Sequence, residues 1–196
     1  MTLPSGSRAA LLPLMGAVLG ALGAGIYEFT GMGALGALLA AMLWSLPAWF
    51  PKEAPAAHRL VDATALAGLP LRWLAIQNFA THDILIAFIA AQAVSRSAMI
   101  ALSWASRPAA NGVGMEFAAT LNSPAALIAI VEGTIAALVC GWRSALVILL
   151  CAYFLIRLAQ TLFYQRSGGV DANALGVTTV AVELATLSVF TFSIGG

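Results

Sequence analysis

The chain has 196 residues, of which 61% are hydrophobic and only 9% are charged, and its mean hydropathy is +0.95. A soluble domain carries roughly a quarter charged residues, so this composition excludes a soluble globular protein. The formal net charge of +1, without any run of lysines or arginines, excludes nucleic acid as a partner, because phosphate binding needs a clustered basic face. The sequence therefore predicts an all-α fold, a polytopic transmembrane helix bundle of six to seven helices, in a single integral membrane domain over residues 1–196 with lipid around it.

Apolar stretches that are long enough to cross a hydrocarbon core follow one another along the chain. The clear spans cover residues 9–27, 31–50, 84–104, 123–141, 144–163 and 175–194. The first is longer than the core of a signal peptide and has no clean cleavage site after it, so it is interpreted as a membrane helix. The first two spans are joined by about four residues and are expected to form a tight hairpin. Small residues predict close helix contacts there: Gly16, Gly20, Gly23, Gly25, Gly31, Gly33 and Gly36.

Three polar segments are expected to be loops, and they cover residues 51–62, 105–122 and 164–174. Residues 63–80 are apolar enough to enter the membrane, but Gly68, Pro70 and Arg72 interrupt them, which predicts a broken or re-entrant helix. If this segment crosses, the bundle has seven crossings rather than six, and all three polar loops share the cytoplasmic side. That arrangement fits the excess of positive charge on cytoplasmic loops better, so it is the one we favour.

Four ionisable residues lie within the apparent spans: Arg96, Glu132, Arg157 and Glu183. An ion at that depth is costly unless it is paired, faces the bundle interior or reaches water, so each is a candidate functional group. The alternative is interhelical pairing, which we favour for Arg157 with Glu132 or with Glu183. For Arg96 and Glu183 a functional role and a pairing role are both open. Asp83 lies at a helix start and is expected to cap it.

No motif of a soluble enzyme is present, and the two histidines, His58 and His82, have no second ligand at zinc spacing. The glycine turns at residues 112–114 and 168–169 could bring backbone amides near a phosphate. Interrupted helices and intramembrane charges also fit a small transporter or channel subunit, but the two halves of the chain show no inverted repeat. The functional class therefore depends on the motifs taken together.

Taken in order, these motifs resemble those of cobalamin synthase, an adenosylcobinamide-GDP ribazoletransferase. PLMGAVLG at residues 13–20 is similar to the family's opening helix, and AVSR at residues 93–96 to its alanine-x-serine-arginine helix. GVGMEF at residues 112–117 is similar to the glycine-rich loop that follows, and GGVDANALG at residues 168–176 to the signature GGxTGDxxGA. Glu183 falls where the family's last helix often has a glutamate. The resemblance extends over most of the chain.

The resemblance implies a transferase of late cobalamin biosynthesis in the bacterial cytoplasmic (inner) membrane. Such enzymes join α-ribazole, or its phosphate, to adenosylcobinamide-GDP and release GMP, with Mg²⁺ neutralising the pyrophosphate. If this chain is active, we expect catalytic roles for Asp62, Asp171 and Arg96, with the two aspartates as metal ligands. Asp62 is out of register with the family's aspartates, and Asn173 holds the position of the aspartate in GGxTGD, two residues after Asp171. The residues that the resemblance implies for binding the corrinoid and nucleotide substrates are His58, Gly112, Gly114, Gly168, Gly169, Asn173 and Glu183.

The acidic signature of the family, roughly GxHxDGLADxxDG, is eroded in this chain. The corresponding stretch is HRLVDATALAG at residues 58–68, and Asp62 is its one carboxylate. The positions of the family's aspartates hold Leu60, Thr64 and Ala67. Two expectations therefore stay open. One is a divergent transferase. The other is a catalytically inactive member of the fold that acts as a membrane assembly or interaction subunit, with a membrane protein or a second copy of itself as its partner.

Overall fold

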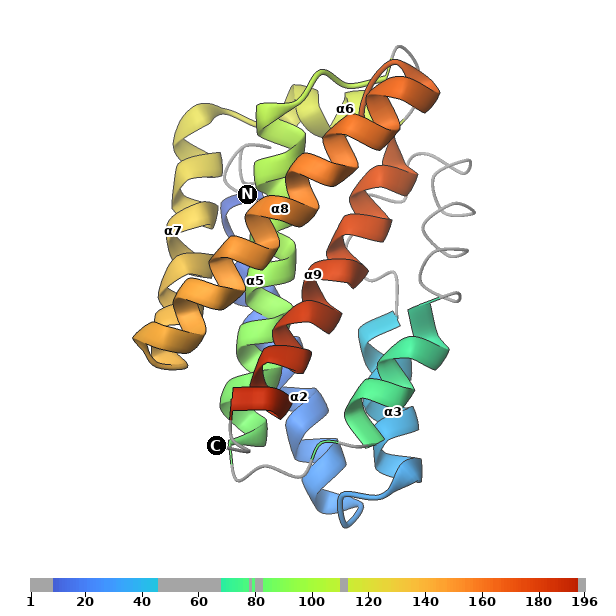
Figure 1. The fold of residues 1–196 in the computed structure, drawn as a ribbon, viewed down its shortest axis with the longest axis vertical. Helices are drawn as coiled ribbons and strands as arrows, with labels where there is room; N and C mark the ends of the chain where they lie inside the picture. The colour runs from blue at the N-terminus through green and yellow to red at the C-terminus, as the bar shows by residue number, and fades with distance from the viewer. Residues whose placement is uncertain (1–8, 46–67, 78, 80–82, 110–112, 194–196) are drawn as a thin grey trace, which may run out of the picture.

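The computed structural model describes residues 9–45, 68–77, 79, 83–109 and 113–193 (Figure 1). Its helices are α2 (Leu12–Phe29), α3 (Ala34–Ser45), α5 (Ile84–Ala105), α6 (Val113–Thr120), α7 (Ser123–Val139), α8 (Trp142–Ser167) and α9 (Ala172–Ser193). Residues 68–77 are helical as well. The only pairing of the β type among the described residues is one isolated bridge. The prediction of an all-α helix bundle is confirmed.

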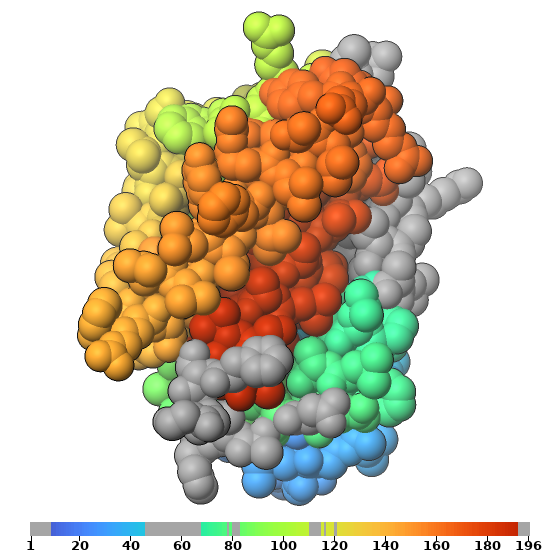
Figure 2. Space-filling view, viewed as in Figure 1, coloured from blue at the N-terminus to red at the C-terminus, as the bar shows by residue number. Residues whose placement is uncertain are grey.

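The helices have the length and composition of membrane spans. Four of them are long and apolar enough to cross a bilayer, namely α2, α5, α8 and α9, whereas α3 and α7 are shorter apolar helices. The outward side of the bundle is apolar too: Phe154 on α8 is 66% exposed, and Leu146 and Leu158 are 54% exposed. Figure 2 shows the side chains of α8 and α9 packed side by side over one face. Such a surface suits lipid, so the protein is an integral membrane helix bundle.

The central helix is α5, against which α2, α7 and α9 all pack. Its sequence suits this position because alanine and serine dominate it, and small side chains let neighbouring helices approach closely in a membrane. Aromatic rings fill the space at its first turns. Phe88 lies between Trp44 at 4.8 Å, Phe79 at 5.7 Å and Tyr27 at 5.9 Å, measured between ring centroids.

Glycines on α2 allow close contact both with α5 and with α3. A Cβ on Gly16 would meet the backbone carbonyl of Gln92, and a Cβ on Gly20 would meet that of Phe88. Gly23 instead faces the indole of Trp44 on α3, whose Nε1 donates to the carbonyl of Leu19 at 3.1 Å. The predicted close contacts are therefore confirmed for these glycines and for Gly36. They are wrong for Gly25, Gly31 and Gly33, where a Cβ would meet no atom of another segment within 4 Å.

One segment differs from its predicted form, and the predicted broken or re-entrant helix is helical in its described part. The stretch at residues 105–122, expected to be a loop, contains the short helix α6, because MEFAA is a run of helix-favouring residues and the side chain of Phe117 packs against the core. Residues 68–77 form a helix that runs alongside α9 in the same direction: Gly68 lies against Val180, and the rings of Phe79 and Phe190 lie 6.4 Å apart. Residues 46–67 lie outside the described part, so the choice of seven crossings stays a prediction.

Candidate functional site

The turn between α8 and α9 is pinned to the stretch that follows α5. The amide of Val170 donates to the carbonyl of Arg107 at 2.9 Å, and the amide of Ala109 donates to the carbonyl of Val170 at 3.0 Å. These two bonds flank a parallel bridge between Pro108 and Val170. Two segments that lie far apart in the sequence, both with predicted substrate-binding residues in or next to them, therefore meet at one end of the bundle (Figure 1).

Gly168 and Gly169 serve this junction in two different ways. Gly168 is the C-cap of α8 with a φ of 69°, a left-handed conformation that glycine adopts without the steric cost of a Cβ. A Cβ on Gly169 would lie 2.7 Å from the backbone nitrogen of Ala109, so only glycine lets the two segments pack this closely. Gly168 thus serves the backbone conformation and Gly169 the packing, and their contact with a substrate stays a prediction.

Asp171 caps the N-terminus of α9. Its Oδ1 accepts a hydrogen bond from the amide of Ala174 at 2.8 Å, and its carbonyl accepts one from the amide of Leu175 at 3.2 Å. A carboxylate at this position satisfies an amide that has no partner within the helix, and it suits the positive end of the helix dipole. Asp171 and Asn173 are both half-buried, so they lie at the edge of the pinned turn.

Three of the predicted site residues, His58, Asp62 and Gly112, lie outside the described residues. Gly114 belongs to the first turn of α6, where the backbone is helical. The metal pair of Asp62 and Asp171 therefore stays a prediction. Within the described ranges, no group of three or more histidine, cysteine, aspartate or glutamate side chains could hold a metal ion.

A buried ion pair occupies the middle of the bundle. The Nε and Nη2 of Arg72 donate to the two carboxylate oxygens of Glu183 at 2.8 and 3.0 Å. The Nη1 of Arg72 donates to the hydroxyl of Ser45 at 3.0 Å. The side chains of Arg72 and Glu183 are only 5% and 1% exposed. This bidentate geometry satisfies both ions without water, which is how an ion pair becomes tolerable at that depth.

Arg96 lies close to this ion pair, on the side of α5 that faces α2. Its Nη1 donates to the backbone carbonyl of Gln92 at 2.9 Å and also to the side-chain oxygen of Gln92. It is within electrostatic range of both Glu183 and Arg72. The guanidinium is thus turned toward the start of α5, away from Ala105, which lies roughly 14 Å further along the helix axis. Arg96 therefore lies with Arg72 and Glu183 in the bundle interior, and not at the end of the bundle that carries the turn between α8 and α9, which we call the pinned end.

The predicted pairing of Arg157 with Glu132 or Glu183 is wrong. Glu183 is taken by Arg72, and the Nη1 of Arg157 donates instead to the side-chain oxygen of Gln160 at 2.9 Å. Glu132 is half-buried, and its buried Oε2 has no hydrogen-bond partner. Asp83 occupies the N-cap of α5 as predicted, but its side chain makes no capping bond.

Sequence reasoning missed the role of Arg72. It treated this residue as an interruption of an apolar segment, and so as a reason to doubt the helix. The sequence does show a cation, Arg72, in one apolar stretch and a carboxylate, Glu183, in another. Together these two residues predict an ion pair in the interior of the bundle. The sequence could not say which cation takes which carboxylate, because helix rotation within the bundle decides that choice.

Comparison with known protein families identifies the family to which the chain is similar. The model of the family described as Cobalamin-5-phosphate synthase matches residues 62–191. The match begins at Asp62 and includes Arg96, the pinned turn with Asp171, and Glu183, whereas α2, α3 and His58 precede it. No curated protein and no solved structure matches the chain. Because the family model covers well over half of the chain, this membrane helix bundle belongs to the cobalamin-5-phosphate synthase family.

Proposed function

We propose that this chain catalyses the transfer step of its family, in which α-ribazole or its phosphate is joined to adenosylcobinamide-GDP with release of GMP. The observation that carries the proposal is the family match, which includes the turn where the carboxylate of Asp171 caps α9. The end that bears this turn also carries Arg107 and Arg166, whereas Arg143 lies at the opposite end of α8. This charge bias supports a cytoplasmic position for the pinned end, in the inner membrane of a bacterium.

The reaction is a substitution at phosphorus. An oxygen of α-ribazole, or of its phosphate, attacks the phosphorus on the cobinamide side of the diphosphate, and the bond from that phosphorus to the GMP oxygen breaks. The work of the protein in such a step is positioning and charge stabilisation. Gly168 and Gly169 would let the diphosphate approach the backbone of the turn, and Asn173 would orient it with its amide.

Magnesium is the cofactor that we propose, with Asp171 and Asp62 as its protein ligands. The chemistry of Asp171 fits one such ligand, because the capping bond uses Oδ1 and a Mg²⁺ ion on a diphosphate needs only one or two protein carboxylates. The ion would neutralise the charge that develops on the leaving phosphate. Asp171 would hold its ligand oxygen in a fixed direction, since the cap restrains the carboxylate against α9.

Arg96 and Glu183 would act beneath this site. Glu183 holds Arg72, and together with Arg96 these three side chains leave one positive charge in the interior. A net positive charge below the pinned end favours a diphosphate above it. We therefore assign Arg96 a long-range electrostatic role without contact with the diphosphate, and Glu183 that of positioning Arg72.

Substitution of Asp171 by asparagine separates the two roles of its carboxylate. Asparagine caps helices as well as aspartate does, so D171N should fold normally, but it lacks the charge that a magnesium ligand supplies. We expect at least a hundredfold loss of GMP release from adenosylcobinamide-GDP in membrane vesicles that contain α-ribazole and Mg²⁺.

A matched control tests capping alone. Asn122 caps α7 with an equivalent bond, from the amide of Ala125 to its Oδ1 at 2.9 Å. N122A should lose about 1 kcal/mol of stability while retaining GMP release. Full activity of D171N would remove Asp171 from the mechanism.

The second candidate is a catalytically inactive member of the family that serves as a membrane assembly subunit. Its support is the stretch at residues 58–68, where Asp62 stands without the family's other aspartates. In that case the wild-type chain releases no GMP in the same assay. A partner that co-purifies with it would then be the next object of study.

A further inference from the structure

Arg157 is a cation on the lipid-facing side of α8. It is exposed, and it lies one helical turn from Phe154, which is 66% exposed, and from Tyr153, which is 57% exposed. The one ion pair that the described residues form joins Arg72 to Glu183, so no described carboxylate neutralises Arg157. A cation among apolar side chains on such a surface is costly unless an anion or water reaches it.

The guanidinium of Arg157 is nevertheless held in place. Its Nη1 donates to the Oε1 of Gln160 at 2.9 Å, and Gln160 is itself 8% exposed. The Nε2 of Gln160 in turn donates to the hydroxyl of Ser106 at 3.0 Å, just after the end of α5. These hydrogen bonds occupy one guanidinium nitrogen of Arg157 and restrain the orientation of the other two. A preformed anion site requires such an oriented guanidinium.

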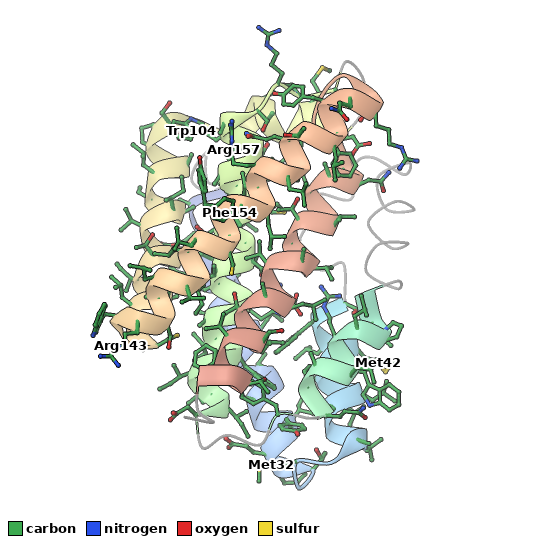
Figure 3. The ribbon with its side chains drawn as sticks, viewed as in Figure 1. Met32, Met42, Trp104, Arg143, Phe154 and Arg157 are labelled. Atoms are coloured by element: carbon green, nitrogen blue, oxygen red, sulfur yellow. The ribbon has the colours of Figure 1, made fainter. Side chains whose placement is uncertain are left out.

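Arg157 is tied through Gln160 to the end of a neighbouring helix. Ser106 is the C-cap of α5, and Gln160 ties Arg157 to it, so the guanidinium is linked to the end of α5 that leads into the bridge with the turn between α8 and α9. Trp104, two residues before Ser106, is 44% exposed, and tryptophan is typical of the level of lipid headgroups. Figure 3 shows Trp104, Phe154 and Arg157 toward this end, with Arg143 at the other end of α8.

We propose that Arg157 binds the phosphate of an anionic phospholipid headgroup, with Trp104 and Phe154 against the upper part of its acyl chains. Charge complementarity carries the choice of occupant: the site offers an oriented guanidinium that no carboxylate among the described residues neutralises, on a surface that otherwise suits hydrocarbon. Anionic lipids give the cytoplasmic leaflet a negative surface potential that attracts basic residues, and Arg107 and Arg166 lie at this same end. The proposal does not depend on the transferase activity.

Native mass spectrometry of the full chain, released from nanodiscs of phosphatidylglycerol or of phosphatidylcholine, tests this site. The wild type is expected to retain phosphatidylglycerol in preference to phosphatidylcholine. R157Q should weaken the binding of phosphatidylglycerol by about fivefold, the effect of one basic residue at an anionic surface. R157K retains the positive charge but not the planar guanidinium, so its binding of phosphatidylglycerol should lie between that of the wild type and that of R157Q.

The control is R143Q, because Arg143 is also exposed on α8 but stacks on Trp142, with 5.4 Å between its guanidinium carbon and the ring centroid. R143Q should bind phosphatidylglycerol as the wild type does. Equal binding by R157Q and the wild type overturns the proposal, as does an equal loss in R143Q. Displacement of the lipid by millimolar inorganic phosphate would point to a site for free phosphate and would also overturn it.

Discussion

Removing the carboxylate of Glu183 should be among the most damaging single changes in this bundle. E183Q deletes the only described anion paired with Arg72 and replaces two hydrogen bonds to a carboxylate, at 2.8 and 3.0 Å, by at most one to an uncharged amide oxygen. The guanidinium of Arg72 then stays buried beside Arg96, and two positive charges share the interior. Breaking a buried ion pair by removing one partner costs about 3–5 kcal/mol.

The double-mutant cycle tests the reasoning as well as the magnitude. The matching single variants R72M and E183L each leave one ion of the pair without its partner and should cost about the same 3–5 kcal/mol, whereas the double variant R72M/E183L removes both charges of the pair, leaves Arg96 as the neighbouring cation, and should cost far less than the sum. Glu28, exposed at the end of α2, is the matched control, and E28Q should change stability by less than about 0.5 kcal/mol. Thermal unfolding in detergent measures each variant. Additive effects in R72M/E183L would refute the claim that the two ions stabilise each other.

Two substitutions test the close backbone approaches. G16A should destabilise the contact between α2 and α5 by about 1–3 kcal/mol, because a Cβ there meets the carbonyl of Gln92; G25A, where the space is open, should be neutral or stabilising. A melting temperature of G25A below that of G16A would contradict this expectation. G169A should separate the pinned turn from Ala109 and raise hydrogen exchange of the amides in the turn, and exchange rates equal to those of the wild type would show that the approach is unnecessary.

Hydropathy predicted most of the bundle because the solvent is lipid. A span must be apolar over about twenty residues, so α2, α5, α8 and α9 stand out in the sequence. Hydropathy does not detect helices that lie in polar stretches. For this reason the segment that contains α6 was expected to be a loop. Its Phe117 packs against the core, and only tertiary structure reveals that contact.

The candidate site was harder to predict than the fold. The capping role of Asp171 was available from sequence, since an aspartate directly before a long helix is a strong N-cap signal, yet it was considered only for Asp83, whose side chain makes no such bond. The partner of Glu183 depended on how α9 is rotated against residues 68–77. No periodicity in an almost uniformly apolar helix specifies that rotation, and the same holds for Arg157.

The transferase activity is tested most directly by complementation. The wild-type chain is expressed in a bacterium that lacks its own cobalamin synthase, under conditions where growth depends on converting cobinamide to cobalamin. Growth is the result that we predict, and it would mean that Asp62 and Asp171 suffice where the family's other aspartates are missing. Absence of growth, with the protein demonstrated in the membrane, would contradict the proposed activity and favour the inactive assembly subunit.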